Sequence, residues 1–199
     1  PSLGNVYCLT DGIEIRAGFC TPALLNPGED PIILDNPYIL ICDRDITHFQ
    51  DFIVLLNELH VLNKPFLIIA KSIRQEALAM LITNRKAGRL NAVAVEYPMF
   101  GKNNDQWLND LSILIGTSVF SENYGNPLLS ATTQSLGRAE RVKISRYDTI
   151  IINGNRNKES VAEKEKIYSE TLDTSLSDSD KKDVRARLAF LQGKAAVIC

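Results

Sequence analysis

Residues 37–96 read PYILICDRDITHFQDFIVLLNELHVLNKPFLIIAKSIRQEALAMLITNRKAGRLNAVAVE, and the spacing of apolar runs in this stretch decides the fold class. Three short apolar runs, at 38–42, 66–70 and 90–96, alternate with two longer segments. Uninterrupted runs of this length are typical of strands that are buried on both faces of a sheet. The alternation predicts parallel strands joined by crossover helices, and therefore an α/β fold.

The two segments between these runs are predicted helices. The first is expected over about 48–62, because the residue before Pro65 disfavours the helical conformation. The second is expected to end near Lys86, with Gly88 as its stop. Each helix is preceded by residues with the capping-box spacing S/T-x-x-E/Q. These pairs are Thr47 with Gln50 and Ser72 with Gln75.

The remaining segments are predicted from their turn residues and apolar spacing. Residues 1–36 are rich in proline and glycine, which favours loops. A helix is expected over 105–115 with Gly116 as its end, and a polar helical hairpin over 155–192. The smaller predicted elements are a turn at 98–101 and short strands at 118–121, 141–144 and 149–152.

Length and composition indicate a soluble domain with a substantial core. The 199 residues are 45% apolar and 23% charged. The 22 basic and 24 acidic residues give a net charge of −2, which provides no general attraction for nucleic acid or an anionic membrane. No apolar run approaches the roughly 20 residues of a membrane span. The four cysteines lack the C-x-x-C spacing, which fits a reducing compartment, and Cys42 is expected to be a buried thiol.

Residues that could carry catalysis are scarce. The chain has no phosphate-binding glycine loop and no nucleophile elbow. Asp43 and Asp45 follow a predicted buried strand, where two carboxylates could hold Mg²⁺ for phosphoryl or glycosyl transfer. We interpret them instead as polar residues that favour the start of the next helix, because the strand at 66–70 ends in Ala70-Lys71 and provides no second acidic strand end. His48 and His60 have no partner at ligand spacing and are interpreted as ordinary helix residues, so no metal site is predicted there.

Both predicted helices carry more apolar residues than one sheet-facing stripe requires. At 100° per residue, Ile53 and Leu56 widen the apolar arc of the first helix to about 180°. Leu78 and Ile82 extend the arc of the second helix toward its edge. These positions either belong to the core or line an exposed apolar groove between the helices. The periodicity alone does not distinguish these alternatives.

A series of short motifs is dispersed between residues 11 and 198. They include Asp11-Gly-Ile, Gly18-Phe19, Thr21-Pro22, Lys64-Pro-Phe-Leu-Ile-Ile-Ala70, Glu76-Ala-Leu-Ala79, Pro98-x-Phe100-Gly101 and Arg187-Leu-Ala-Phe-Leu-Gln-Gly193. In this order they resemble the motifs of the apical domain of GroEL-type (group I) chaperonins. The resemblance implies a swivelling β/β/α architecture with a C-terminal helical hairpin. It also implies that residues 1–199 are a single apical domain of a longer chain, without its intermediate and equatorial domains.

The resemblance implies a molecular chaperone function and a binding site. The family binds non-native polypeptides and the mobile loop of a GroES-type co-chaperonin. Both occupy a groove between two helices and a neighbouring N-terminal segment. Carried over to this sequence, the groove residues are Phe19, Leu24, Ile53, Leu56, Leu78, Ile82, Thr83 and Asn84.

The same resemblance implies how the whole protein would work. This piece would hold no catalytic residue or cofactor, whereas the full-length protein would bind ATP and Mg²⁺ in its equatorial domain. It would be monomeric alone, with the ring formed through the missing domains, in a bacterial or phage-infected cytoplasm or an organelle matrix. Ala17, Ala23 and Thr83 differ from the family pattern, so allostery and affinity are expected to differ. The alternatives are a Mg²⁺-dependent enzyme that uses Asp43 and Asp45, or a domain specific for one partner.

Overall fold

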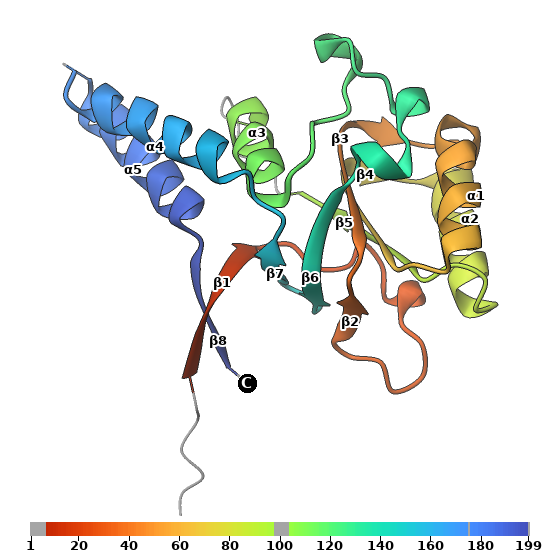
Figure 1. The fold of residues 1–199 in the computed structure, drawn as a ribbon. Coiled ribbons are helices and arrows are strands. Elements are labelled where there is room, and N and C mark those ends of the chain that lie inside the picture. The colour runs from red at the N-terminus through yellow and green to blue at the C-terminus, as the bar shows by residue number, and fades with distance from the viewer. Residues whose placement is uncertain (1–6, 98–103, 175, 199) are drawn as a thin grey trace, which may run out of the picture.

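The computed structural model describes residues 7–97, 104–174 and 176–198, in which eight strands join one mixed sheet (Figure 1). The strands are β1 (Tyr7–Ile15), β2 (Ile32–Asp35), β3 (Tyr38–Ile46), β4 (Phe66–Ile73), β5 (Ala92–Glu96), β6 (Gly137–Ile144), β7 (Thr149–Gly154) and β8 (Lys194–Ile198). The α-helices in the described ranges are α1 (Ile53–Leu62), α2 (Gln75–Lys86), α3 (Asn104–Ile115), α4 (Lys158–Leu172) and α5 (Asp178–Gln192).

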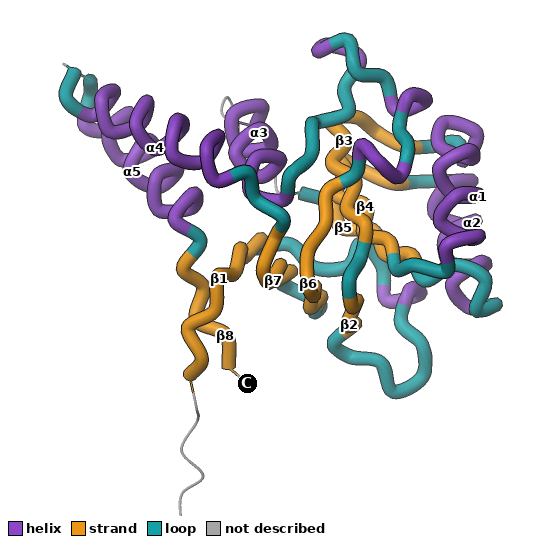
Figure 2. Tube along the Cα trace, viewed as in Figure 1, coloured by secondary structure: helices purple, strands orange, loops and turns teal. Residues whose placement is uncertain are grey.

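The sheet combines a parallel part with an antiparallel part. Its strand order is β5-β4-β3-β6-β7-β1-β8, and β2 pairs with β6 beside this path. β3, β4 and β5 are parallel, whereas the other described strand pairs are antiparallel. The α/β prediction and the parallel unit with crossover helices are therefore confirmed. In the tube view, the β1 and β8 ribbon begins near the end of α5 and extends away from both α5 and the parallel part (Figure 2).

The parallel strands are covered on both faces. Leu40 and Ile68 are fully buried on the face where α1 and α2 pack. Ile39 and Ile69 are fully buried on the opposite face, in the cluster that includes Leu111 of α3. Since successive side chains of a strand point to opposite faces, a strand covered on both sides requires an uninterrupted apolar run.

Both predicted helices over the parallel strands are present, but neither starts at its predicted capping box. A 3₁₀ turn, η2 (Phe49–Phe52), precedes α1, and no side-chain hydrogen bond caps the start of η2, α1 or α2. The hydroxyl of Ser72 donates to the Asp45 carboxylate at 2.5 Å instead. The reason is that β3 and β4 continue to Ile46 and Ile73, so residues expected to cap helices lie at strand ends.

The loop-rich region predicted at 1–36 has loops and a short 3₁₀ turn at 16–31 but strands at 7–15 and 32–35 among its described residues. It contains β1 and β2, which pair with β7 and β6 from the second half of the chain. In β2, Ile32 and Leu34 are buried while the residues after each are exposed, the alternation of a strand with one covered face. Pairings between such distant segments leave no local signal, and the prolines in this region favoured the loop prediction.

The smaller elements agree with prediction in part. The expected strand at 118–121 is absent, and Phe120 forms only an isolated bridge with Cys42. The two later predicted strands lie within β6 and β7. The predicted turn at 98–101 lies outside the described residues.

The predicted polar hairpin is confirmed as α4 and α5, which lie beside α3 and far from α1 and α2 (Figure 1). A buried polar cluster joins it to α3. The Tyr168 hydroxyl donates to Asp110 Oδ1 at 2.6 Å, and Arg187 Nε donates to Asp110 Oδ2 at 3.0 Å. Burial raises the pKa of Asp110, and Arg187 counteracts that rise. α4 and α5 have 15 residues each, and no described helix is long and apolar enough to cross a membrane.

Candidate functional site

A surface hollow of about 240 Å³ lies between α1 and α2, on the outer side of the parallel strands. We call it the α1/α2 groove. Its apolar lining residues are Phe49, Ile53, Leu56, Met80 and Leu90, and its polar lining residues are Asn57, His60, Asn84 and Arg89. Small-molecule pockets usually enclose about 300–1,000 Å³. The groove is therefore better suited to single side chains of a larger partner than to a whole cofactor.

The α1 wall of the groove is built by residues beside its sheet-facing stripe. Leu55 and Leu59 are almost fully buried against the sheet, with 1% and 0% of their surface exposed. Ile53 retains 38% exposure and Leu56 retains 7%. The structure thus places both predicted α1 residues at the groove, but most of the free apolar surface belongs to Ile53.

The α2 wall contains one residue of the predicted set. Asn84 lines the groove, and its Nδ2 donates to the Met80 carbonyl at 2.9 Å, which holds the side chain along the helix. Thr83 is exposed but does not line the groove, and its hydroxyl donates to the Ala79 carbonyl at 2.8 Å. Met80 provides the apolar part of this wall.

The other two predicted residues of α2 lie outside the groove. Leu78 is half-buried and packs against the core under α1 and α2. Ile82 is half-buried and packs against the apolar cluster of the opposite core, which contains Leu24. The two residues are four apart on α2 and neither lines the groove with Ile53.

The predicted contact residues of the N-terminal segment belong to the core, which corrects the expectation that they line the groove. Phe19 is 7% exposed and forms a bridge with Val95, and Leu24 is completely buried. The Leu24 carbonyl accepts a hydrogen bond from Arg85 Nε at 2.7 Å, so this segment is held against α2. In this structure both apolar side chains support α2 from beneath.

Several lining residues were missed by the sequence analysis. Asn57 and His60 follow Ile53 at helical spacings of four and seven, and that periodicity could have assigned them to the same face. Arg89 and Leu90 follow α2 and reach the groove through the turn of the chain. No periodic signal exists for those two residues, because they belong to no helix.

A second apolar strip lies on another side of α1. Val54, Val61 and Leu62 are 60%, 82% and 46% exposed. They line a wider hollow of about 710 Å³ with residues 132–134. We call these three residues the outer strip, and they provide apolar controls on the same helix as Ile53.

The carboxylates at the strand ends have separate partners. Asp43 accepts a hydrogen bond from the Tyr97 hydroxyl at 2.8 Å. Asp45 accepts from Ser72 and lies 4.0 Å from Lys71 Nζ. Burial raises the pKa of Tyr97, and its hydrogen bond to Asp43 raises it further. Within the described residues there is no cluster of three or more side chains suited to a metal ion.

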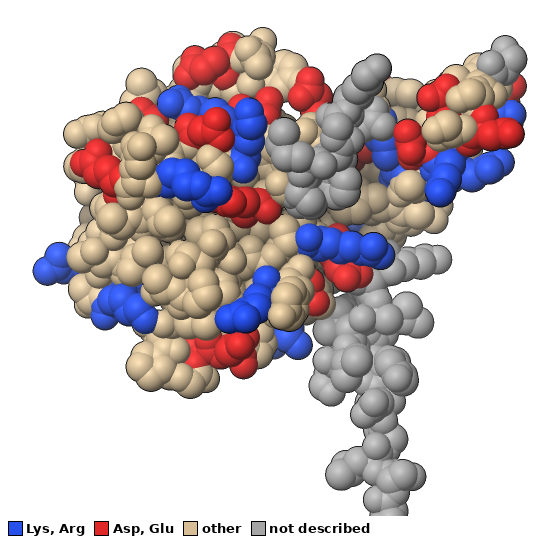
Figure 3. Space-filling model, turned by 180° about the vertical axis from the view of Figure 1, so that it is seen from behind, with Lys and Arg blue, Asp and Glu red and all other residues tan. Residues whose placement is uncertain are grey.

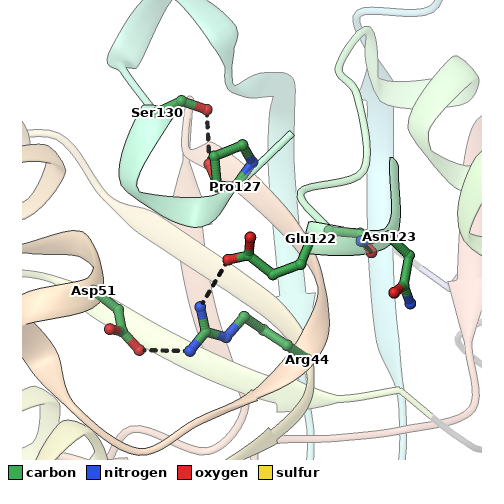
Figure 4. Close-up of polar contacts among 7 residues, drawn as sticks. Arg44, Asp51, Glu122, Asn123, Pro127 and Ser130 are labelled. Carbon is green, nitrogen blue, oxygen red and sulfur yellow. Dashed lines mark hydrogen bonds and ion pairs between the residues drawn. The ribbon is translucent and has the colours of Figure 1, made fainter. Parts of the chain in front are cut away.

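Arg44, which lies between Asp43 and Asp45 in the sequence, also pairs with carboxylates elsewhere in the fold. Figure 4 shows Arg44 reaching Asp51 and Glu122, with distances of 3.0 and 3.4 Å. Beside this pair, the Ser130 hydroxyl donates to the Pro127 carbonyl at 2.7 Å and closes a 3₁₀ turn. Arg44 therefore links β3 to the segment before α1 and to the loop above it, which is a structural role.

The two cysteines with described side chains are protected thiols. Cys42 is fully buried and Cys20 is half-buried. Burial raises the pKa of each thiol to about 12. Because the thiolate is the nucleophile, thiols that stay protonated at neutral pH do not provide a catalytic nucleophile.

No protein-family model matches this chain. The function must therefore be inferred from the chemistry of the described surface and from the motifs in the sequence.

Proposed function

We propose that this chain is the polypeptide-binding apical domain of a divergent GroEL-type chaperonin, and that the α1/α2 groove captures apolar segments of non-native polypeptides. The observation that carries this proposal is the groove itself. Ile53 and Met80 provide the apolar parts of its two walls, and Leu56 and Leu90 form its floor. Exposed apolar surface of this kind is typical of sites for apolar partners.

The chemistry of the groove favours broad substrate selection. Burying apolar surface stabilises a complex by about 25 cal/mol per Å². This contribution has no direction, so side chains of similar size are accepted in any sequence context. A single groove of this size binds weakly, and a ring of such grooves would bind one unfolded chain at several points and gain by avidity.

The motifs in the sequence support the finer assignment. Lys64 to Ala70 forms the turn after α1 and the first part of β4, and Glu76 to Ala79 lies in α2. Packing requires glycine at position 18, because a Cβ there would lie 2.2 Å from the Ser145 carbonyl oxygen. By the resemblance, the fold is the swivelling β/β/α architecture of chaperonin apical domains.

The resemblance also supplies the proposed partners. Unfolded polypeptides and the mobile loop of a GroES-type co-chaperonin would compete for the groove. The ring, ATP and Mg²⁺ would belong to the intermediate and equatorial parts of the longer protein. This piece would then bind substrate without hydrolysing ATP, in the cytoplasm of a bacterial or phage-infected cell or in an organelle matrix.

Fluorescence anisotropy with several unrelated, labelled apolar peptides tests the proposal. Ile53→Ser removes exposed apolar surface from the groove, and Val61→Ser removes it from the outer strip of the same helix. We expect Ile53→Ser to lower the affinity for every peptide by about tenfold, which corresponds to about 1.4 kcal/mol of binding free energy. Val61→Ser is expected to leave the affinities unchanged.

Three results would contradict the proposal. Absence of binding to all peptides would exclude a general apolar site. Equal weakening by both substitutions would show that the groove is not the site. Binding of one peptide alone would instead support a domain specific for one partner.

A further inference from the structure

The α1/α2 region is rich in positive charge. Between Phe52 and Val95 the sequence has only two acidic residues, Glu58 and Glu76, against six basic ones. The basic residues are Lys64, Lys71, Arg74, Arg85, Lys86 and Arg89. This region therefore carries a local net charge of +4 in a chain whose total charge is −2.

Three of these basic residues are paired with carboxylates outside the groove. Arg74 pairs with Glu96, and Arg85 pairs with Glu29. The Lys71 ammonium lies 4.0 Å from an Asp45 oxygen. These contacts neutralise the charge where the strands end and beneath α2, but not at the groove.

Arg89 provides the charge of the groove itself. It is exposed and lines the hollow, and no Asp or Glu is among the residues that line it. Within the described residues, its guanidinium has no carboxylate partner. A guanidinium presents donors in a planar fork that matches a carboxylate.

The backbone of Arg89 is held at the groove by two neighbours. Its amide donates to the Asn84 carbonyl at 2.9 Å. Its carbonyl oxygen lies 2.7 Å from His60 Nδ1, and because a carbonyl only accepts, Nδ1 is the donor in this contact. The backbone of Arg89 is thus tied to both helices, and its side chain lines the hollow beside Leu56 and Leu90.

We infer that the groove prefers apolar segments that carry a carboxylate side chain next to their apolar residues, and disfavours the same segments with lysine. This inference rests on the proposed function and adds a charge preference to it. Figure 3 shows, on the face seen from behind, a wide area without charged side chains, with both Lys or Arg and Asp or Glu side chains at its border. An apolar side chain would fill the hollow while an adjacent carboxylate reaches Arg89.

The expected preference is modest, because the charge lies at an exposed rim. Exposed ion pairs contribute about 0.2–1 kcal/mol, so one carboxylate should improve binding about two- to fivefold. Lysine in the same place should weaken binding by a similar factor, since it meets Arg89 as a like charge. The preference should fade at about 1 M salt, where the screening length is about 3 Å.

Three labelled peptides with one leucine-rich core, flanked by glutamate, glutamine or lysine, test the inference by fluorescence anisotropy in about 0.01 M salt. We expect affinity to fall in that order. Arg89→Gln should abolish the difference in affinity between the glutamate and glutamine peptides. Lys182→Gln is the matched control, because Lys182 is an exposed cation of α5 at the other end of the molecule.

The outcomes separate this inference from the proposed function. If the glutamine peptide binds and Ile53→Ser weakens it, but all three flanks give equal affinity, the charge preference is overturned and the groove remains. The preference is also overturned if Lys182→Gln has the same effect as Arg89→Gln, or if Arg89→Gln weakens the glutamine peptide equally. If no peptide binds the wild-type chain, the proposed function itself fails.

Discussion

The two helical layers on the parallel strands differ in what covers them. On one face, α3 packs on the sheet and the α4/α5 hairpin lies beside it, with the Trp107 ring 6.0 Å from Tyr97 and 5.9 Å from Phe190. On the other face, α1 and α2 pack on the sheet equally well, but Ile53 and the outer strip remain exposed. Among the described residues, the first layer exposes one large apolar side chain, Ile167 of α4 at 46%, whereas the second exposes Ile53 and the three residues of the outer strip.

This difference separates residues needed for folding from residues available for binding. Leu55 and Leu59 are enough to anchor α1 on the sheet. Ile53 and the outer strip add less to the core than Leu56 does, and exposed apolar surface lowers solubility unless a partner covers it. The contrast between the two layers is therefore the main physical reason to place a partner site on α1 and α2.

The largest loss of stability is expected from a substitution in the layer formed by α3, α4 and α5. Asp110→Ala removes the buried carboxylate that Tyr168 and Arg187 contact and leaves the Arg187 charge without its partner. We expect a loss of about 3–5 kcal/mol in the free energy of unfolding, measured by urea denaturation. Glu163→Ala, an exposed acidic position on α4, is the control and should change little. A loss below about 1 kcal/mol would show that the cluster does not hold the hairpin.

An intermediate change in stability is expected from the pH dependence of the Cys42 thiol, which is buried beneath α1 and α2. The pKa of Cys42 is raised from 9.0 to about 12, so the folded protein keeps the proton after the unfolded chain has lost it. The contribution of the protonated Cys42 thiol to the free energy of unfolding is complete below pH 9 and is lost as pH rises toward 12. At about pH 10 the wild type should lose about 1–2 kcal/mol more than Cys42→Ala, relative to about pH 8.

Urea denaturation at the two pH values provides this comparison, and only the pH-dependent part is compared because the substitution also changes packing. Equal losses in the two proteins would contradict the account. They would mean that solvent reaches Cys42 and that α1 and α2 separate from the sheet.

The smallest changes in the free energy of unfolding are expected for substitutions of partly or fully exposed residues of α1. Val61→Ser replaces a side chain that is 82% exposed and should change the free energy of unfolding by less than about 0.5 kcal/mol, whereas Ile53 is 38% exposed and Ile53→Ser should cost about 1 kcal/mol. Leu56→Ser should cost more, because that side chain is only 7% exposed. Thermal or urea unfolding measures all three. A large loss for Ile53→Ser would assign that residue to the core and remove it from the binding surface.

The sequence was informative where local pattern controls structure. The three apolar runs identified β3, β4 and β5, and helical periodicity placed Ile53 and Leu56 beside the core stripe. β1 and β2 were missed because their partners lie far away along the chain. The capping boxes failed because both hydroxyls have other partners: Ser72 lies in β4 and donates to Asp45, and the Thr47 hydroxyl contacts His48 Nδ1.

The candidate site was predictable only in part. Periodicity indicates which helix face is apolar but not how deeply each residue is buried, so the complete burial of Leu24 could not be anticipated. The positions of Arg89 and Leu90 depend on how the chain turns after α2. The contact between His60 and Arg89 joins two crossover segments, and no spacing in the sequence encodes it.

The most direct test of the central claim is an NMR titration of the ¹⁵N-labelled chain with an unlabelled apolar peptide. The account predicts that amide shifts change for α1, for the second half of α2 and for residues 89–90. It also predicts that α4 and α5 remain unchanged. Shift changes confined to the hairpin, or an absence of changes at saturating peptide, would contradict the assignment of the α1/α2 groove as the polypeptide-binding site.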